Sequence, residues 1–186
     1  MEHKKFKTLS SEPVFVNKWW NIVHEKVELG DGTTGDWWVN LAQSGVLVFA
    51  LTEGGKVVVN RQYKHGISEV VTELCIGMVD GDDGGPLAEA KRELMEETGY
   101  GGGDWEALGS FASNPTSSRS RVHMFMARGV RKMAEPVHDP REVVETSEVA
   151  LEELVAMIDR GEFSTSAAMA GIFLALRKLG KLEFKV

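Results

Sequence analysis

The sequence has little cysteine, an excess of negative charge and no long hydrophobic run. The single cysteine, Cys75, excludes an intramolecular disulfide and a zinc site built on paired thiolates. With 21 Lys and Arg against 28 Asp and Glu, the formal net charge is -7, which argues against broad nucleic-acid binding. No stretch approaches the roughly 20 apolar residues of a membrane span, and residues 1–11 are too polar for a signal peptide. These absences predict a cytoplasmic protein with no membrane or nucleic-acid partner.

The N-terminal third of the chain has the composition of β-strands. Residues Val14–Leu29 and Trp37–Leu41 are rich in β-branched and aromatic side chains, and the Gly-rich segment 30–35 between them predicts a hairpin or meander. The apolar runs Val46–Leu51 and Val57–Val59 follow, joined by a Gly-Gly turn. Such runs predict strands buried on both faces.

Helical periodicity appears in the centre and at the C-terminal end. A helix is expected to begin near Pro86 and to end at Gly99, and another to begin after an N-cap at Ser164. The helix that follows Ser164 is expected to cover residues 168–179. A further helix is expected at 151–158, and strands are expected at 107–112, 122–127 and 143–149. Early strands with helices between and after them predict a layered α/β or α+β domain.

The densest charge pattern is the run Arg92-Glu93-Leu94-Met95-Glu96-Glu97. On a helix, Glu93 and Glu97 lie one turn apart, about 5–6 Å between Cβ atoms, with Glu96 beside them. Like charges so close are unfavourable, and a divalent cation such as Mg²⁺, which prefers oxygen ligands, would compensate. The alternative is a solvated acidic face that Arg92 and Lys91 partly neutralise.

Together with Gly77, the segment Arg92–Tyr100 resembles the signature box of the Nudix hydrolases. The second half of the box, Arg-Glu-aliphatic-x-Glu-Glu-x-Gly-apolar, matches at every fixed position. The first half departs from it: fourteen residues separate Gly77 from Arg92 where the family has thirteen, and Asp83 or Gly84 stands where the family has an isolated Glu. The role of that Glu therefore passes to Asp83 or is lost.

Further positions resemble the subfamily that cleaves ADP-ribose and nucleoside diphosphate sugars. They are Arg61-Gln62-Tyr63-Lys64, the pair Glu73-Leu74 and Pro115, which stands 16 positions after Gly99. The resemblance implies an α/β/α sandwich around a mixed β-sheet, preceded by an N-terminal antiparallel β segment. On this basis residues 1–42 are expected to form a dimerisation segment and residues 43–186 the Nudix hydrolase domain.

The resemblance also implies a metal site on the central helix. Mg²⁺, for which Mn²⁺ is able to substitute, would be bound by Glu93, Glu96, Glu97 and the backbone carbonyl of Ile76. Arg92 would orient the box carboxylates through ion pairs. Arg92 and Glu97 therefore also belong to the expected catalytic residues.

A carboxylate base is expected outside the box. In related enzymes it lies on a later acidic loop, here 138–145, where Glu142 is the first candidate, Glu145 the second and Asp139 the third. The alternative for each of them is an ordinary solvated loop charge.

Five residues are expected to contact the substrate: Arg61, Glu73, Trp37, Pro115 and Arg119. Arg61 and Lys64 would grip phosphate or sugar, and Arg119 lies in a cationic loop after Pro115; a solvent-exposed strand face and a mobile surface loop are the alternatives. Trp37 belongs to a group of four tryptophans that would either stack on a nucleobase or fill a dimer interface.

The expected activity is Mg²⁺-dependent hydrolysis of the pyrophosphate bond of ADP-ribose or a related nucleoside diphosphate sugar by a homodimer. The products would be a nucleoside monophosphate and a sugar phosphate. Two other hypotheses are a Nudix housecleaning enzyme acting on an oxidised nucleoside triphosphate or a dinucleoside polyphosphate, and a non-catalytic nucleotide sensor. The intact box carboxylates argue against a sensor, whereas the altered first half of the box favours it.

Overall fold

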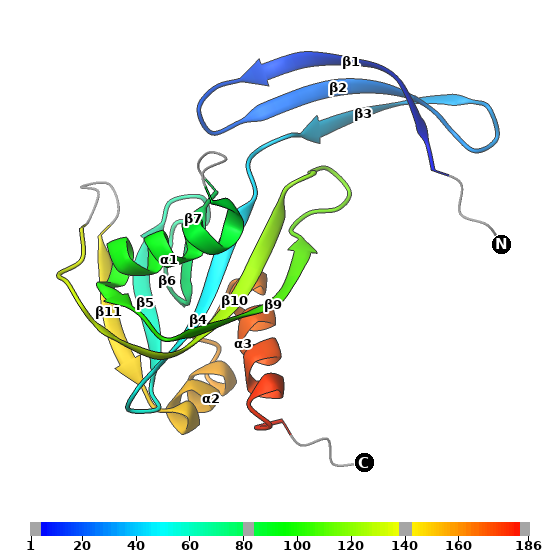
Figure 1. The fold of residues 1–186 in the computed structure, drawn as a ribbon. Helices are drawn as coiled ribbons and strands as arrows, with labels where there is room; N and C mark the ends of the chain where they lie inside the picture. The colour runs from blue at the N-terminus through cyan, green and yellow to red at the C-terminus, as the bar shows by residue number, and fades with distance from the viewer. Residues whose placement is uncertain (1–4, 80–83, 138–142, 183–186) are drawn as a thin grey trace. The chain divides into compact units, whose positions relative to one another are not determined.

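The computed structural model describes residues 5–79, 84–137 and 143–182. The chain divides into two compact units (Figure 1). The N-terminal unit comprises residues 1–44 together with 112–121, and the core unit comprises residues 45–111 and 122–186.

The N-terminal unit is built on an antiparallel sheet in the order β1-β2-β3. Its strands are β1 (Lys7–Val16), β2 (Asn21–Glu28) and β3 (Thr34–Asn40). The predicted hairpin is present and joins β2 to β3 across the Gly-rich turn. Along β2 every second residue from Val23 to Val27 is buried, whereas every residue of β1 is exposed.

A tight turn separates β1 from β2, where the sequence predicted strand from Val14 onward. The Asn17 side-chain carbonyl accepts hydrogen bonds from the backbone N–H groups of Trp19 and Trp20, both at 2.8 Å, and this caps the turn. Strand β1 begins already at Lys7, in the polar stretch for which no strand was predicted. Because β1 is exposed throughout, it requires no alternation of apolar residues that the sequence could display.

The core unit contains a mixed sheet in the order β11-β5-β4-β10-β8, with β6, β7 and β9 paired to β5, β4 and β10. Strands β4 and β10 are parallel, whereas β5 is antiparallel to both β4 and β11. The strands are β4 (Gly45–Thr52), β5 (Val57–Lys64), β6 (Glu69–Glu73), β7 (Cys75–Met78), β8 (Tyr100–Gly101), β9 (Asp104–Ala112), β10 (Arg121–Lys132) and β11 (Val144–Val149). The short strands β6, β7 and β8 were not predicted.

Helices cover both faces of this sheet (Figure 1). They are α1 (Gly85–Thr98), α2 (Leu151–Asp159) and α3 (Ser166–Lys178). Leu47 and Phe49 of β4 pack in one core cluster with α2 and α3, and Val46 and Val48 pack in the other with α1. Successive residues of a strand point to opposite faces, so the continuous apolar run of β4 fills both clusters. The predicted α/β/α sandwich is confirmed.

The N-terminal end of α3 differs from the prediction by one residue. Thr165, and not Ser164, is the N-cap, and its hydroxyl accepts a hydrogen bond from the backbone N–H of Ala168 at 3.4 Å. None of the helices in the described part of the chain is long and apolar enough to cross a membrane.

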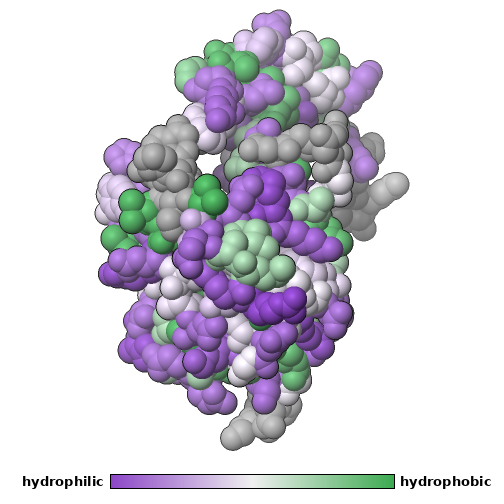
Figure 2. All heavy atoms as spheres, turned by 60° about the vertical axis from the view of Figure 1, so that its left-hand side comes forward, coloured by the Kyte–Doolittle hydropathy of each residue, from purple (hydrophilic) through white to green (hydrophobic). Residues whose placement is uncertain are grey.

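Large apolar side chains are exposed on the N-terminal unit. Eight of them are at least 45% exposed: Phe6, Leu9, Val14, Phe15, Val16, Trp19, Trp20 and Trp38. Figure 2, which shows one face of the whole molecule, has hydrophobic patches within a mostly hydrophilic surface. Exposed apolar groups in such number on one small sheet are typical of an interaction surface.

Candidate active site

Helix α1 positions the acidic residues of the site. Its first turn contains Pro86, and it ends at Gly99, which has φ 72° and donates its N–H to the Met95 carbonyl at 2.9 Å. A Cβ atom at Gly99 would lie 2.0 Å from the Ala134 carbonyl oxygen, so only glycine fits here. Leu94, which is fully buried, fixes the apolar face of the helix against the sheet. The rotation of the helix is thereby set, and with it the directions of the glutamates.

Arg92 connects three carboxylates of the same helix. Its guanidinium donates to Glu89 at 2.8 Å, to Glu93 at 2.6 Å and to Glu96 at 2.5 Å. The hydrogen bond to Glu89 and the negative charges nearby raise the pKa of Arg92 above its usual range. Arg92 therefore neutralises part of the acidic run and restrains the side chains it touches.

Glu97 projects into the body of the core unit. Its Oε2 accepts a hydrogen bond from Asn60 Nδ2 on β5 at 3.0 Å. Burial is the main cause that raises the pKa of Glu97 to about 7; a hydrogen bond from the Cys75 thiol opposes the rise, and the charge of Glu93 adds to it. The buried Cys75 thus lies against a predicted catalytic residue.

Glu93 lies against strand β7. Burial raises the pKa of this carboxyl, and the Arg92 guanidinium opposes the rise. A Cβ atom at Gly77 would lie 2.2 Å from Glu93 Cδ and 2.6 Å from its Oε1. Gly77 thus lets the β7 backbone touch the Glu93 side chain, next to Ile76. This close approach explains why glycine occupies the position.

A second acidic group lies on β6, where Glu73 is only 3% exposed. Its Oε1 is 2.6 Å from Lys64 Nζ and accepts a hydrogen bond from Gln62 Nε2 at 2.5 Å. The charge of Glu73 contributes to the raised pKa of Glu97, so the two carboxylates share one electrostatic environment. The structure therefore brings Glu73 of β6 together with Glu93 and Glu97 of α1.

Residues 41–169 match the NUDIX domain family. This chain belongs to that family. The matched range includes Gly77 and the segment Arg92–Tyr100, and the predicted family is confirmed.

Two curated relatives span nearly the whole Nudix chain. It is 28% identical over 181 residues to the ADP-ribose pyrophosphatase of Bacillus subtilis (strain 168), covering 96% of this chain and 97% of that protein. It is 29% identical over 175 residues to the methanol dehydrogenase activator of Bacillus methanolicus, and the match covers 92% of this chain and 94% of that protein. A solved structure of an ADP compounds hydrolase matches with a TM-score of 0.84 and 18% identity, covering 98% of this chain and 100% of that chain. At that identity the likeness shows the fold.

The Nudix box residues do not form a ready-made metal cage. Within residues 5–79, 84–137 and 143–182, no three Asp, Glu, His or Cys side chains converge as metal ligands. Arg92 holds Glu93 and Glu96 on one side, while Asn60 and Cys75 hold Glu97 on the other.

The chemistry of the donors nevertheless fits a hard divalent cation. Glu93, Glu97 and Glu73 are carboxylates whose charges interact: burial is the main cause that raises the pKa of Glu97, and the negative charges of Glu93 and Glu73 add to the rise. Mg²⁺ prefers oxygen ligands and adds two positive charges to such a site. Glu93 and Glu97 are the residues that would hold it, with Glu96 next to them on the helix.

The acidic loop is only partly described. Glu142 and Asp139 lie outside the described residues, and their assignment as bases stays a prediction. Glu145 lies on β11, where its Oε2 is 3.5 Å from an Arg61 nitrogen. Both side chains are more than half exposed, so the ion pair leaves either group free to meet a substrate.

The other predicted substrate contacts, Trp37, Pro115 and Arg119, belong to the N-terminal unit. Arg119 donates to both carboxylate oxygens of the buried Glu25, at 2.8 and 2.9 Å. The Trp37 ring is half-buried beside Phe6, with ring centroids 5.5 Å apart. Their roles in substrate binding stay predictions.

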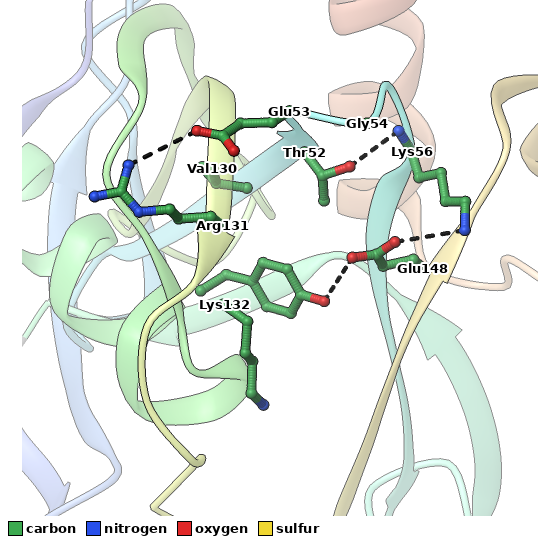
Figure 3. A pocket seen from close by; sticks show the side chains of 9 residues that line it. Thr52, Glu53, Gly54, Lys56, Val130, Arg131, Lys132 and Glu148 are labelled. Carbon is green, nitrogen blue, oxygen red and sulfur yellow. Dashed lines mark hydrogen bonds and ion pairs between the residues drawn. The ribbon is translucent and has the colours of Figure 1, made fainter.

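Each unit also contains a cavity. The one in the N-terminal unit measures about 390 Å³ and is lined by two indole rings, hydroxyls and amides: Trp20, Ile22, Trp38, Asn40, Ser113, Asn114, Ser117, Ser118 and Ser120. The one in the core unit measures about 310 Å³ and contains no predicted metal ligand (Figure 3). There the Tyr100 hydroxyl donates to Glu148 at 2.7 Å, and Glu148 is also 3.6 Å from Lys56.

Sequence reasoning missed Asn60 and Thr146 and assigned no role to Gln62. Asn60 and Gln62 are buried on β5, and Thr146 bonds to Asn60 from β11. The available signal was alternation: polar side chains stand at every second position after an apolar run. On a strand this places them on one face, which is unusual for a buried strand without a function.

Proposed function

We propose that the chain hydrolyses the pyrophosphate bond of ADP-ribose or a related nucleoside diphosphate sugar in a Mg²⁺-dependent reaction. The match to the NUDIX domain and the similarity over almost the whole chain to an ADP-ribose pyrophosphatase support this activity. The observation that carries the proposal is the group of interacting carboxylates Glu73, Glu93 and Glu97, in which the pKa of Glu97 is raised and the Gly77 backbone lies against Glu93.

The residues of the core unit have distinct roles in this proposal. Glu93, Glu96, Glu97 and the Ile76 carbonyl bind the cation, and Arg92 keeps Glu93 and Glu96 in place. A bound Mg²⁺ supplies charge neutralisation for the diphosphate and acidifies water. The chain's own groups hold the donors in position, and the partial burial of Glu97 limits the contact of this carboxylate with bulk water.

A carboxylate of the acidic loop completes the reaction by accepting a proton from the attacking water. Glu142 is the first candidate for this base and Glu145 the second. Arg61 is paired with Glu145 in this structure and would bind the diphosphate of the substrate, which carries two negative charges where the carboxylate carries one. Glu73 would act through its charge next to Glu97 or contact the substrate.

The N-terminal unit is proposed to bind the nucleoside part. Its cavity combines the indole rings of Trp20 and Trp38 with serine and asparagine side chains, a chemistry suited to a nucleobase and a ribose. Trp37, Pro115 and Arg119 lie in the same unit and are proposed to contribute to substrate binding.

A substrate screen tests the proposed activity. Phosphate released by a coupled phosphatase should appear with ADP-ribose or another nucleoside diphosphate sugar in the presence of Mg²⁺, and should disappear with EDTA. The same screen includes nucleoside triphosphates and dinucleoside polyphosphates. A preference for these would favour the housecleaning hypothesis, and binding without turnover would favour a sensor. Full activity in a chelated, metal-free preparation would contradict the mechanism.

The protein is further proposed to be a cytoplasmic homodimer with its N-terminal sheet in the interface. The fully exposed strand β1 and the exposed apolar residues of the N-terminal unit support this, since a small sheet of this kind needs a packing partner. Light scattering should give twice the chain mass of 20.5 kDa. Val16→Lys should shift the protein toward the monomer, whereas Thr8→Lys, on the same strand at a polar position, should not. A monomer at micromolar concentration would contradict the proposal.

A further inference from the structure

Strand β5 presents a row of hydrogen-bond donors to the acidic site. Asn60, Gln62 and Lys64 alternate along the strand and therefore share one face. The first donates to Glu97 and the other two contact Glu73. Asn60 is 0% exposed, so its amide has no access to solvent and must satisfy its polar atoms within the protein.

The amide of Asn60 is held at both ends. Its Nδ2 donates to Glu97 Oε2 at 3.0 Å, and its Oδ1 accepts a hydrogen bond from Thr146 Oγ1, also at 3.0 Å. An ionised carboxylate only accepts hydrogen bonds, so a flipped amide would place two acceptors against each other. The Thr146 hydroxyl favours the productive orientation because it donates to Oδ1.

This arrangement is built into the sheet. Thr146 on β11 is the direct cross-strand partner of Asn60 on β5 in the antiparallel register. The Thr146–Asn60–Glu97 chain therefore links the strand that follows the acidic loop to the Nudix box helix. The buried thiol of Cys75 is the second donor to Glu97. A carboxylate has about four lone-pair sites, so two hydrogen bonds leave room for a cation.

We infer that Asn60 and Thr146 are positioning residues that orient the Glu97 carboxylate for the divalent cation. This inference rests on the proposed function, in which Glu97 binds the metal. Donors that hold a metal-binding carboxylate remove its rotational freedom before the cation arrives, and such outer partners commonly affect metal affinity about 10–100-fold. The effect is expected to be larger for Asn60, which touches Glu97, than for Thr146, which acts through Asn60.

The test compares isosteric variants of Thr146 by Mn²⁺ binding and by kinetics. Free Mn²⁺, measured by electron paramagnetic resonance, gives the dissociation constant; ADP-ribose hydrolysis gives kcat and the Mg²⁺ activation constant. Thr146→Val should weaken Mn²⁺ binding by about tenfold and raise the Mg²⁺ activation constant similarly. At saturating Mg²⁺, kcat should change much less. Thr146→Ser keeps the hydroxyl and should restore affinity.

Ser147→Ala is the matched control. Ser147 is exposed on the same strand and points to the opposite face, so its loss removes a hydroxyl without touching Asn60. It should bind Mn²⁺ as the wild type does. Circular dichroism checks that each variant is folded. If the Thr146→Val protein does not fold, Thr146→Ala and Asn60→Ala replace it in the measurements of Mn²⁺ binding and kinetics.

The outcomes separate the inference from the proposed function. Wild-type affinity for Mn²⁺ in folded Thr146→Val and Asn60→Ala proteins overturns the inference while leaving the hydrolase activity in place. A wild-type protein that binds Mn²⁺ but hydrolyses no nucleoside diphosphate sugar overturns the proposed function; weaker Mn²⁺ binding in the variants still supports the inference. A wild-type protein that binds no Mn²⁺ overturns the inference.

Discussion

Replacing Glu97 by Gln should lower Mg²⁺-dependent turnover by orders of magnitude and leave the protein folded. The substitution keeps the shape of the side chain but removes the charge that would hold the cation. A bound metal contributes several kcal/mol to the transition state, and each ~1.4 kcal/mol corresponds to a factor of ten, so kcat/KM should fall by about 10³-fold. Steady-state kinetics with the preferred substrate measures the loss.

The same substitution should remove a pH dependence of stability. The pKa of Glu97 is about 7 in the folded protein and 4.5 in the reference state, so folding favours the protonated form. The contribution of this group to the free energy of unfolding is therefore fully present below pH 4.5, the reference pKa, and is lost as the pH rises through 7, the folded pKa. Between about pH 5 and pH 8 the metal-free wild type should lose roughly 2 kcal/mol more free energy of unfolding than Glu97→Gln. Urea denaturation in EDTA measures this difference.

Glu69→Gln serves as the control for both measurements. Glu69 is exposed on β6, so the same chemical change there should alter neither turnover nor the pH profile of unfolding. An active Glu97→Gln enzyme would contradict the assignment of Glu97 to the metal site. Identical pH profiles for wild type and Glu97→Gln would contradict the effect of burial on this carboxyl.

Gly77→Ala should inactivate the enzyme through the position of Glu93. The added Cβ would lie 2.2 Å from Glu93 Cδ and 2.4 Å from its Cγ, so the carboxylate must move. Gly77 has no positive φ, and its backbone accepts alanine without conformational strain. The expected result is a folded protein with metal affinity reduced by about 10–100-fold, measured by Mn²⁺ titration.

Gly66→Ala tests whether the effect belongs to this contact. Gly66 also lacks a positive φ, and a Cβ there would meet no atom within 4 Å. This variant should match the wild type in metal affinity and turnover. If Gly77→Ala binds Mn²⁺ with wild-type affinity, the close approach of the β7 backbone to Glu93 has no role in the metal site.

The sequence was sufficient for the local features of the core unit. Pro86 and Gly99 bracket α1 because proline suits a first helical turn and glycine suits the left-handed conformation at the end. The spacing of Glu93 and Glu97 places them one turn apart in any α-helix. These signals act within a few residues, so they are visible without a tertiary structure. Residues 7–13 of strand β1, in contrast, were missed because an exposed strand carries no pattern of burial.

The sequence by itself determined the family, the layered fold and the helix that carries the acidic residues. Only the tertiary structure decided which groups meet those residues. Asn60 lies 37 positions from Glu97, and Thr146 lies 86 positions from Asn60. Arg119 was expected to face a substrate, and it pairs with Glu25, 94 positions away. Such contacts follow from strand register and from the packing of helix against sheet, and no local stretch of sequence encodes either of them.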